Sequence, residues 1–483
     1  MIGQSAQQFG TDRGPYQGGP NRAGPGSDRR PDMSNVSLFD WTIYRHMFSA
    51  KRMEAIFGER GTMERWIDVE RAVARAQSTL GIIPADAGVE IDRRLNADGI
   101  DLERLHEDTV DVGRPIVGLV RQMVEQVGGD HAAWVHYGIT TYDAMDTGKV
   151  LQLRDGLNEV SAQLSSYRNL LSDLAAKHRD TVMIGRTNNL HAQPMTFGAK
   201  VANWIEEMRR HEERLTQVRE RVLVVQFGGS VGSLASLQPD GLAFREEAAK
   251  ELGLGTIQSN WHNARDSVTE MSLCQGNLCA SLARIAQNIN QLGSTEIGEL
   301  AEGGEPGRGR SSAMAHKRNP RAAEFAEAVA RLGRQRAMGM VEVMGQDHDR
   351  CGGTWISEWM LLPETFLLTS GALSWAIDLL NRLEVDKGRM RANVEMTNGL
   401  ALTERYTIAL SKRINKLEAR SLLDEACALA TAEQVSLSAA LCLMPKVLAV
   451  MNADEIAALA DPETYIGSSH DIVDGVLGTA KDG

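Results

Sequence analysis

Apolar residues recur at helical spacing along most of the chain. Residues 62–80 show this clearly, with apolar positions at Met63, Trp66, Ile67, Val69, Val73 and Ala76. Positions three and four apart lie on one face of an α-helix, so the run predicts a helix with one buried face. Gly81 follows the run and Pro84 comes shortly after it, which is typical of a helix end.

Longer segments with the same periodicity occupy the middle of the chain. They cover 150–177, 197–223, 267–297 and 322–343. The second carries one continuous apolar stripe, made by Phe197, Val201, Trp204, Ile205, Met208, Leu215 and Val222. These segments exceed the usual helix length of about 11–12 residues. Long helices that are apolar on more than one face favour a bundle covered by neighbouring subunits.

The chain of 483 residues therefore predicts an all-α protein with several domains. Residues 1–35 are rich in Gly, Pro, Arg, Asp and Gln, and we expect them to form a disordered N-terminal extension. We expect an N-terminal helical domain over 36–140, a central helical-bundle domain over 141–390 and a C-terminal helical domain over 391–483. No internal repeat is evident.

Composition excludes several classes of binding partner and indicates the cellular compartment. The net charge is −12, which argues against binding to nucleic acid or to an anionic membrane. No apolar run approaches the length of a membrane span, and the N-terminus lacks the apolar region of a secretory signal. We therefore expect a cytoplasmic protein. The five cysteines are scattered through helical patterns without metal-ligand spacing, and we interpret them as reduced core residues.

Polar loops interrupt the helical background at three places. They are HYGITTYDAMDTG at 136–148, GRTNNLHAQP at 185–194 and GGEPGRGRSSAMAHKRNP at 303–320. Each precedes a long helical pattern, so each offers backbone N–H groups and a helix N-terminus, which suit anions. Three such loops in one chain fit a small substrate that carries two carboxylates.

The third loop carries the most specific chemistry. Its glycines predict a mobile lid, and Ser311 and Ser312 precede Lys317 and Asn319. A serine acts as a base only if its oxyanion is strongly stabilised, at about 1.4 kcal/mol for each unit of pKa depression. Lys317 together with backbone N–H groups is a source of that stabilisation. The same residues also fit a glycine-rich surface loop before a basic helix start.

In order and context the three segments resemble the signature regions of the fumarase/aspartase superfamily, over about residues 38–480. SSAMAHKRNP is similar to the superfamily signature. The segments 261–270, 396–404 and 461–474 look like the branch that contains adenylosuccinate lyase and 3-carboxymuconate cycloisomerase, and the cycloisomerase side in particular. The resemblance implies three domains, with a five-helix bundle that packs into the twenty-helix core of a homotetramer. It also implies active sites where three subunits meet, each giving one loop.

The resemblance further implies roles for individual residues. Ser311 would be the catalytic base, Lys317 would steady the developing enolate-like carboxylate, and Asn319 would hydrogen-bond the substrate. Thr140 and Thr141 match the pair that holds a carboxylate in this branch. The candidate catalytic residues are Ser311, Lys317 and His191. The candidate substrate-binding residues are Thr140, Thr141, Arg186, Thr187, Asn188, Arg210, Gln226, Arg310, Ser312, Met314 and Asn319.

Departures from the family pattern bear on the leaving group. Fumarases and adenylosuccinate lyases place a histidine after the Arg-Thr of the second loop, where this chain has Asn188. An amide cannot act as a general acid, so a leaving group that is already a stable anion fits best. Another histidine typical of adenylosuccinate lyases is missing from 113–122, and Trp359 replaces an arginine of the nucleotide site. Adenylosuccinate lyase activity is therefore disfavoured.

Two arginines admit two interpretations. Arg310 stands where relatives have glycine, and Arg210 lies on the long helix after the second loop. Either guanidinium can bind an anionic group of the substrate, or it can be an ordinary solvated side chain.

Our leading hypothesis is elimination from a C2-substituted succinate to give fumarate, with nitrosuccinate as substrate and nitrite as leaving group. The chain looks like the nitrosuccinate lyases of this superfamily. Alternatives are cycloisomerisation of 3-carboxy-cis,cis-muconate, a carbon–nitrogen lyase reaction of the adenylosuccinate type, and a non-catalytic scaffold. Retention of Ser311, Lys317 and Asn319 counts against the scaffold.

No metal or organic cofactor is expected. A phosphate-binding or dinucleotide glycine motif is missing, and the histidines lack the paired spacing of a metal site. They lie in different segments, at His131, His136, His191, His262 and His316.

Overall fold

The computed structural model describes residues 37–304 and 307–478. The extension expected at 1–35 lies outside these described residues. The chain divides into two compact units, Met1–Arg45 and His46–Gly483. In the first unit, Trp41 stacks on Tyr44 with ring centroids 5.9 Å apart, beside the 3₁₀ helix Thr42–Tyr44. The domain boundaries expected at 140 and 390 stay predictions.

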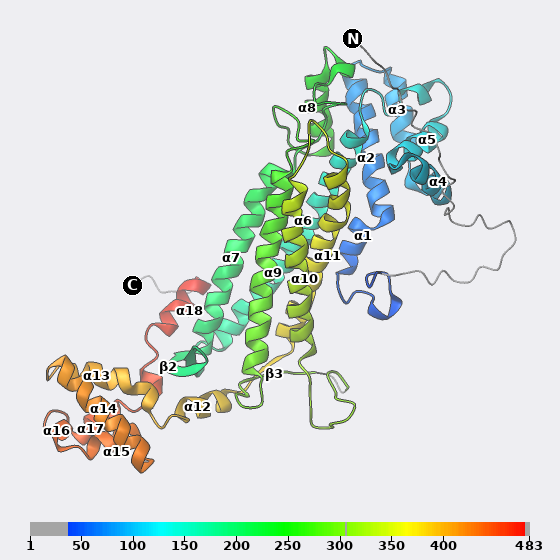
Figure 1. The fold of residues 1–483 in the computed structure, drawn as a ribbon. Helices are drawn as coiled ribbons and strands as arrows, with labels where there is room; N and C mark the ends of the chain where they lie inside the picture. The colour runs from blue at the N-terminus through cyan, green and yellow to red at the C-terminus, as the bar shows by residue number, and fades with distance from the viewer. Residues whose placement is uncertain (1–36, 305–306, 479–483) are drawn as a thin grey trace, which may run out of the picture. The chain divides into compact units, whose positions relative to one another are not determined.

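Five long helices form a closed bundle in the second unit (Figure 1). In ring order, α6 packs on α7, α7 on α9, α9 on α10, α10 on α11, and α11 again on α6. Their bounds are Thr141–Lys177 for α6, Phe197–Val222 for α7, Asp266–Leu292 for α9, Arg321–Val343 for α10 and Gly353–Asn381 for α11. The all-α fold expected from the sequence is confirmed, and the bundle has the five helices that the resemblance implies.

Helix α11 corrects the expectation that no apolar run reaches the length of a membrane span. By length and composition alone this helix is apolar enough to cross a membrane. More than half of its most apolar window is buried inside the chain, and it contacts α6, α9 and α10. We therefore interpret it as a core helix of the bundle.

Shorter helices precede and follow the bundle. Before it come α1 (Lys51–Phe57), α2 (Glu59–Thr79), α3 (Ala85–Arg94), α4 (Leu102–Val112) and α5 (Pro115–Val127). Helix α8 (Gly241–Leu252) falls between α7 and α9 in the sequence and packs on α2. After it come α12 (Lys387–Glu395), α13 (Thr403–Ser411), α14 (Lys416–Glu433), α15 (Leu437–Cys442), α16 (Pro445–Leu448), α17 (Ala453–Ala458) and α18 (Ser469–Leu477). A separate apolar core joins α13, α14 and α15.

Two small antiparallel sheets accompany the helices. One pairs β1 (Val182–Thr187) with β2 (Leu190–Thr196), and the other pairs β3 (Leu300–Glu302) with β4 (Leu383–Val385). The segment expected as a polar loop at 185–194 is therefore most of a β-hairpin. The cysteines are free thiols, as expected, but only Cys279 is fully buried, and the other four are partly exposed.

Candidate active site

Ser311 lies in the segment between β3 and α10, where two backbone N–H groups point at its hydroxyl. Its Oγ accepts hydrogen bonds from Ala313 N at 3.3 Å and from Met314 N at 3.1 Å. Donors fixed around an oxygen stabilise negative charge that develops on it. Ser311 is half-buried, whereas Ser312 and Met314 are exposed. The loop thus supplies the backbone part of the stabilisation that a serine base requires.

The loop is held in shape by its own backbone. Ser311 N donates to Lys317 O at 3.3 Å, and Arg310 and Arg318 form an isolated antiparallel bridge. Both the backbone N and the side-chain Nδ2 of Asn319 donate to Gly309 O, at 2.8 and 3.0 Å. Gly309 has a positive φ of 66°, and a Cβ there would lie 2.5 Å from Asn319 O. Only glycine fits this position without strain.

Lys317 has an exposed side chain that lines a cleft of about 510 Å³ together with Glu302 and Glu384. Burial raises the pKa of Glu302, although its hydrogen bonds oppose this. Both carboxylate oxygens of Glu302 accept the N–H of Ala322, at 2.9 and 3.0 Å. The first turn of α10 is therefore partly occupied by a carboxylate of the chain itself, and this N–H is not available to a substrate anion.

Asn188 and Asn189 form the tight turn between β1 and β2. Their φ values are 51° and 65°, in the left-handed region that asparagine tolerates better than most residues. Thr187 pairs with Leu190 across the turn, and Asn188 is exposed at its tip. The backbone of the turn thus gives a conformational reason for asparagine at 188, in addition to any contact with substrate.

Arg186 anchors the hairpin to the segment before β3. Its two terminal nitrogens contact the buried carboxylate of Glu299 at 2.9 and 2.6 Å, and Asn393 Nδ2 donates to the same carboxylate at 2.8 Å. A forked guanidinium–carboxylate pair of this kind is strong and directional. In the single chain the guanidinium of Arg186 is therefore paired with the carboxylate of Glu299. The sequence did not single out Glu299, because its partner lies more than a hundred positions away.

His191 is half-buried beside this pair, across the hairpin from Arg186. Burial and the nearby Arg186 lower the pKa of His191. The imidazole therefore favours its neutral form near pH 7. Behind the hairpin lies a cleft of about 750 Å³, which is lined in part by Lys200 and Arg284 on the bundle helices. Burial, assisted by Arg186, also lowers the pKa of Lys200.

Thr140 immediately precedes the first residue of α6. Its backbone N donates to Asp143 Oδ2 at 3.1 Å, and the buried Asp143 also accepts the N–H groups of Gly228 and Gly229 at 2.9 and 3.0 Å. Arg350 Nη1 donates to Thr140 Oγ1 at 3.2 Å. The carboxylate of Asp143 thus fixes the loop around Thr140, and the hydroxyl of Thr140 already contacts the guanidinium of Arg350.

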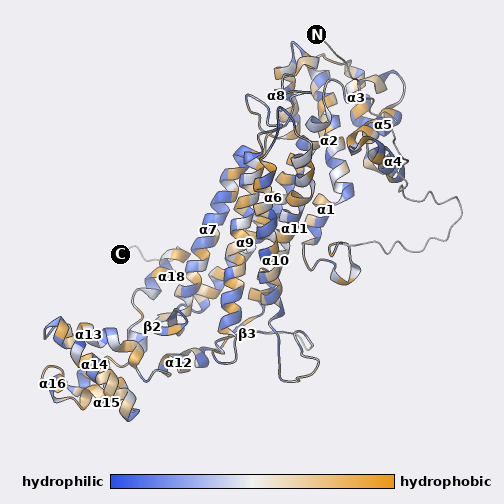
Figure 2. Cartoon of the chain, viewed as in Figure 1, coloured by the Kyte–Doolittle hydropathy of each residue, from blue (hydrophilic) through white to orange (hydrophobic). Residues whose placement is uncertain are grey.

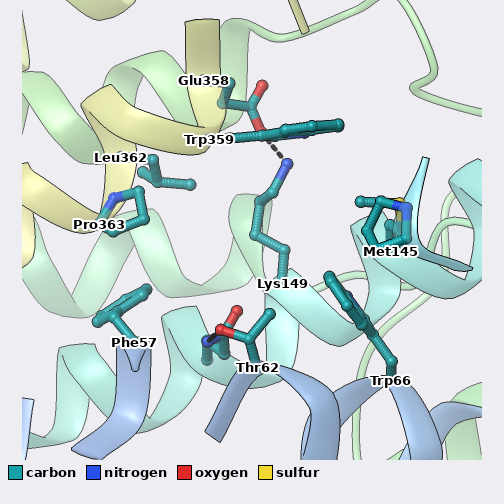
Figure 3. A pocket seen from close by; sticks show the side chains of 11 residues that line it. Phe57, Thr62, Trp66, Met145, Lys149, Glu358, Trp359, Leu362 and Pro363 are labelled. Atoms are coloured by element: carbon teal, nitrogen blue, oxygen red, sulfur yellow. Dashed lines mark hydrogen bonds and ion pairs between the residues drawn. The ribbon is translucent and has the colours of Figure 1, made fainter. Parts of the chain in front are cut away.

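A buried charge cluster joins the first turns of α6 to Arg265, at the start of α9, and to Glu358 on α11. Lys149 Nζ contacts Asp146 at 3.1 Å and Glu358 at close range, and Arg265 contacts Asp146 at 2.7 Å. Burial would raise the pKa of Asp146, but Arg265 and Lys149 outweigh it and hold that pKa at about 2. Figure 3 shows Lys149 reaching toward Glu358 beside the ring of Trp359, in a small cavity of about 200 Å³. The two carboxylates are thereby matched by two cations.

Gln226 contacts the first loop, because its backbone N–H donates to Thr147 Oγ1 at 3.0 Å. Gln226 is buried, and its Oε1 accepts the N–H of Trp261 at 2.7 Å. Arg210 is exposed on α7, and Thr141 is half-buried at the start of α6.

The three segments do not meet in one chain. The hairpin and the Ser311 loop lie at the same end of the bundle, because Arg186 at the hairpin contacts Glu299 beside β3. The Thr140 loop begins α6, whereas the hairpin follows its end. Since α6 has 37 residues, its ends lie roughly 55 Å apart at about 1.5 Å per residue. A site that uses all three segments requires more than one chain.

Comparisons with known proteins agree with the all-α fold of the chain. Residues 45–335 match the lyase family, and residues 399–476 match the family of the adenylosuccinate lyase C-terminus. The chain belongs to the fumarase/aspartase superfamily of lyases. It is similar to 3-carboxy-cis,cis-muconate cycloisomerase of Pseudomonas aeruginosa, with 39% identity covering 90% of this chain and 95% of that one.

Other members of the superfamily act on different substrates. N-acetyl-S-(2-succino)cysteine lyase of Dickeya dadantii is 35% identical, covering 91% of this chain and 97% of that one. Nitrosuccinate lyase of Streptomyces davaonensis is 34% identical, covering 88% and 92%. Among solved structures, fumarate lyase from Mesorhizobium sp. BNC1 has a TM-score of 0.84 at 38% identity, covering 90% of this chain and 99% of that one. The protein is therefore an enzyme of this superfamily.

Proposed function

We propose that the enzyme eliminates the C2 substituent of a substituted succinate to give fumarate, and that its substrate is nitrosuccinate. Ser311, as the alkoxide, takes a proton from the carbon that bears no nitro group. The electron pair of that C–H bond forms the double bond, the carbon–nitrogen bond breaks, and nitrite leaves with the electron pair of that bond. The observation that carries the proposal is the pair of N–H groups directed at Ser311 Oγ.

Asn188 supports a leaving group that requires no proton. The amide cannot donate a proton as an acid does, and His191 favours its neutral form because its pKa is lowered. Nitrite is a weak base and departs without protonation. Two relatives described above are named for eliminations from C2-substituted succinates.

We also propose a homotetramer with shared active sites. The Thr140 loop and the Ser311 loop lie at opposite ends of the bundle, so an antiparallel copy would bring them together. Apolar side chains are exposed on α9, α10 and α11, whose hydropathy is coloured in Figure 2, and a second bundle would cover them. These are Leu273, Leu332, Met338, Val341, Ile356 and Met360, and Met344 follows directly after α10.

The second candidate reaction is cycloisomerisation of 3-carboxy-cis,cis-muconate. It is favoured by the 39% identity to a cycloisomerase, and it also avoids a leaving group that needs an acid. The test offers both substrates to the purified enzyme. Fumarate absorbance and nitrite release report the first reaction, and loss of the muconate absorbance reports the second. Turnover of the muconate without any nitrite from nitrosuccinate would replace the first proposal with the second.

A further inference from the structure

Two arginines that the sequence did not single out, Arg114 and Arg350, lie beside Thr140. Arg350 lies over the ring of Tyr142 at 4.7 Å and donates to Thr140 Oγ1. Arg114 lies over the rings of Trp355 and Trp359, at 5.4 and 5.6 Å. Tyr142 and Trp355 are stacked with centroids 3.8 Å apart. Both guanidinium groups are thus held on one aromatic platform.

The backbone also places the two arginines close together. Tyr142 OH donates to Cys351 O at 2.6 Å, which fixes the segment that follows Arg350. A Cβ at Gly352 would lie 3.3 Å from Arg114 Nη2, so that guanidinium reaches the same segment. Electrostatics agree: burial raises the pKa of Tyr142, and Arg350 and Arg114 both act against that rise.

Neither arginine pairs with a carboxylate in the part of the chain that the structure describes. Among the described residues no Asp or Glu oxygen lies within 4.0 Å of either guanidinium. Asp146, which accepts a hydrogen bond from Trp355 Nε1 at 2.8 Å, pairs instead with Lys149 and Arg265, and Glu358 pairs with Lys149. Two unmatched guanidiniums beside a threonine hydroxyl and a helix N-terminus leave an excess of positive charge that an anion would satisfy.

We infer that Arg114 and Arg350 form an anion clamp on the Tyr142–Trp355 stack, which binds one carboxylate of the substrate beside Thr140. The inference rests on the proposed function for the identity of the ligand, a small dicarboxylate. The forked guanidinium matches a carboxylate, and its aromatic support limits the conformational freedom that binding must remove. The clamp makes the site selective for a doubly charged ligand over one whose carboxylate is esterified.

The test measures binding rather than turnover, with fumarate and monomethyl fumarate as probes. Calorimetry gives the affinities of both probes. We expect R114Q and R350Q each to weaken fumarate binding roughly tenfold or more and to reduce its preference over the ester. R114K and R350K should recover part of the loss. R420Q removes one exposed positive charge from α14 and should leave both affinities unchanged.

The outcomes separate the clamp from the proposed reaction. Fumarate affinity that stays within twofold in R114Q and R350Q, with unchanged thermal stability, would overturn the clamp. So would a wild-type enzyme that binds neither probe or does not distinguish them. A wild-type enzyme that binds fumarate through both arginines but releases no nitrite from nitrosuccinate would leave the clamp standing and remove the proposed substrate.

Discussion

The backbone N–H of Met314 donates to Oγ of Ser311 at 3.1 Å, across three positions of a glycine-flanked loop. The N–H of Ala313 approaches the same oxygen at 3.3 Å. The donors are in place before any substrate arrives, so negative charge on this oxygen requires little rearrangement of the loop. The neighbouring Ser312 has no such pair among the hydrogen bonds of the described residues, although the two side chains are chemically identical.

Replacing Ser311 with alanine should abolish turnover while leaving the fold intact. Removal of a catalytic base typically lowers the rate by about 10²–10⁴-fold, and we expect S311A to lie at the upper end. S421A, which removes an exposed serine hydroxyl from α14, is the control and should retain at least a third of the wild-type kcat. Steady-state kinetics and circular dichroism check both. An S311A enzyme with more than a tenth of wild-type kcat would exclude Ser311 as the base.

We expect Asn188 to have two separable roles, one in the turn and one toward substrate. N188G keeps a residue that accepts positive φ, so the apparent Tm should not change, whereas kcat/KM should fall roughly tenfold through loss of one hydrogen bond. N188V places a branched side chain at a φ of 51° and should lower stability by about 1–2 kcal/mol. Thermal unfolding and kinetics of the two variants separate the roles. Wild-type kinetics in N188G would restrict Asn188 to the turn.

The buried Arg186–Glu299 ion pair should contribute to the stability of the fold. R186A leaves a buried carboxylate without its cation, which typically costs about 3–5 kcal/mol. R186M/E299Q removes both charges and should recover at least half of that loss, because Asn393 still hydrogen-bonds position 299. Chemical denaturation of the three proteins measures the difference. Equal losses in the single and double variants would contradict this account.

Strong periodicity and local motifs were readable from the sequence, whereas contacts distant in sequence were not. The spacing predicts a helix over 197–223, and α7 covers Phe197–Val222. Helix α11 is apolar on nearly all sides, so no single stripe marks it. The hairpin was missed because its strands are short and its Asn-Asn turn is typical of a polar loop. Ser311 could be predicted as a site residue from its motif. Arg114 and Arg350 could not, because only their tertiary contacts with Trp355 and Tyr142 bring them to the same place.

Two buried histidines should make the enzyme less stable in mild acid. Burial lowers the pKa of His178 to about 4 and that of His211 to about 4, whereas an unfolded histidine has a pKa near 6.5. Below pH 6.5 the unfolded chain therefore binds more protons than the folded one, and stability falls from pH 6.5 toward pH 4. The apparent Tm measured at steps from pH 7.5 to 4.5 should show this fall. H178Q and H211Q should each flatten the curve, and a wild-type Tm that rises over this interval would contradict the assignment.

Mixing two inactive variants tests whether the sites are shared. T140A/T141A damages the loop that begins α6, and S311A damages the loop at the other end of the bundle. If each site takes these loops from different subunits, random reassembly of equal amounts gives about a quarter of the sites two intact loops. Activity should therefore appear on co-refolding, at about a quarter of the wild-type value per site, and not on simple mixing of folded enzymes. If one chain supplied both loops, every site would keep one damaged loop and no activity would return. The roughly 55 Å between the ends of α6, at about 1.5 Å per residue, argues for the first outcome.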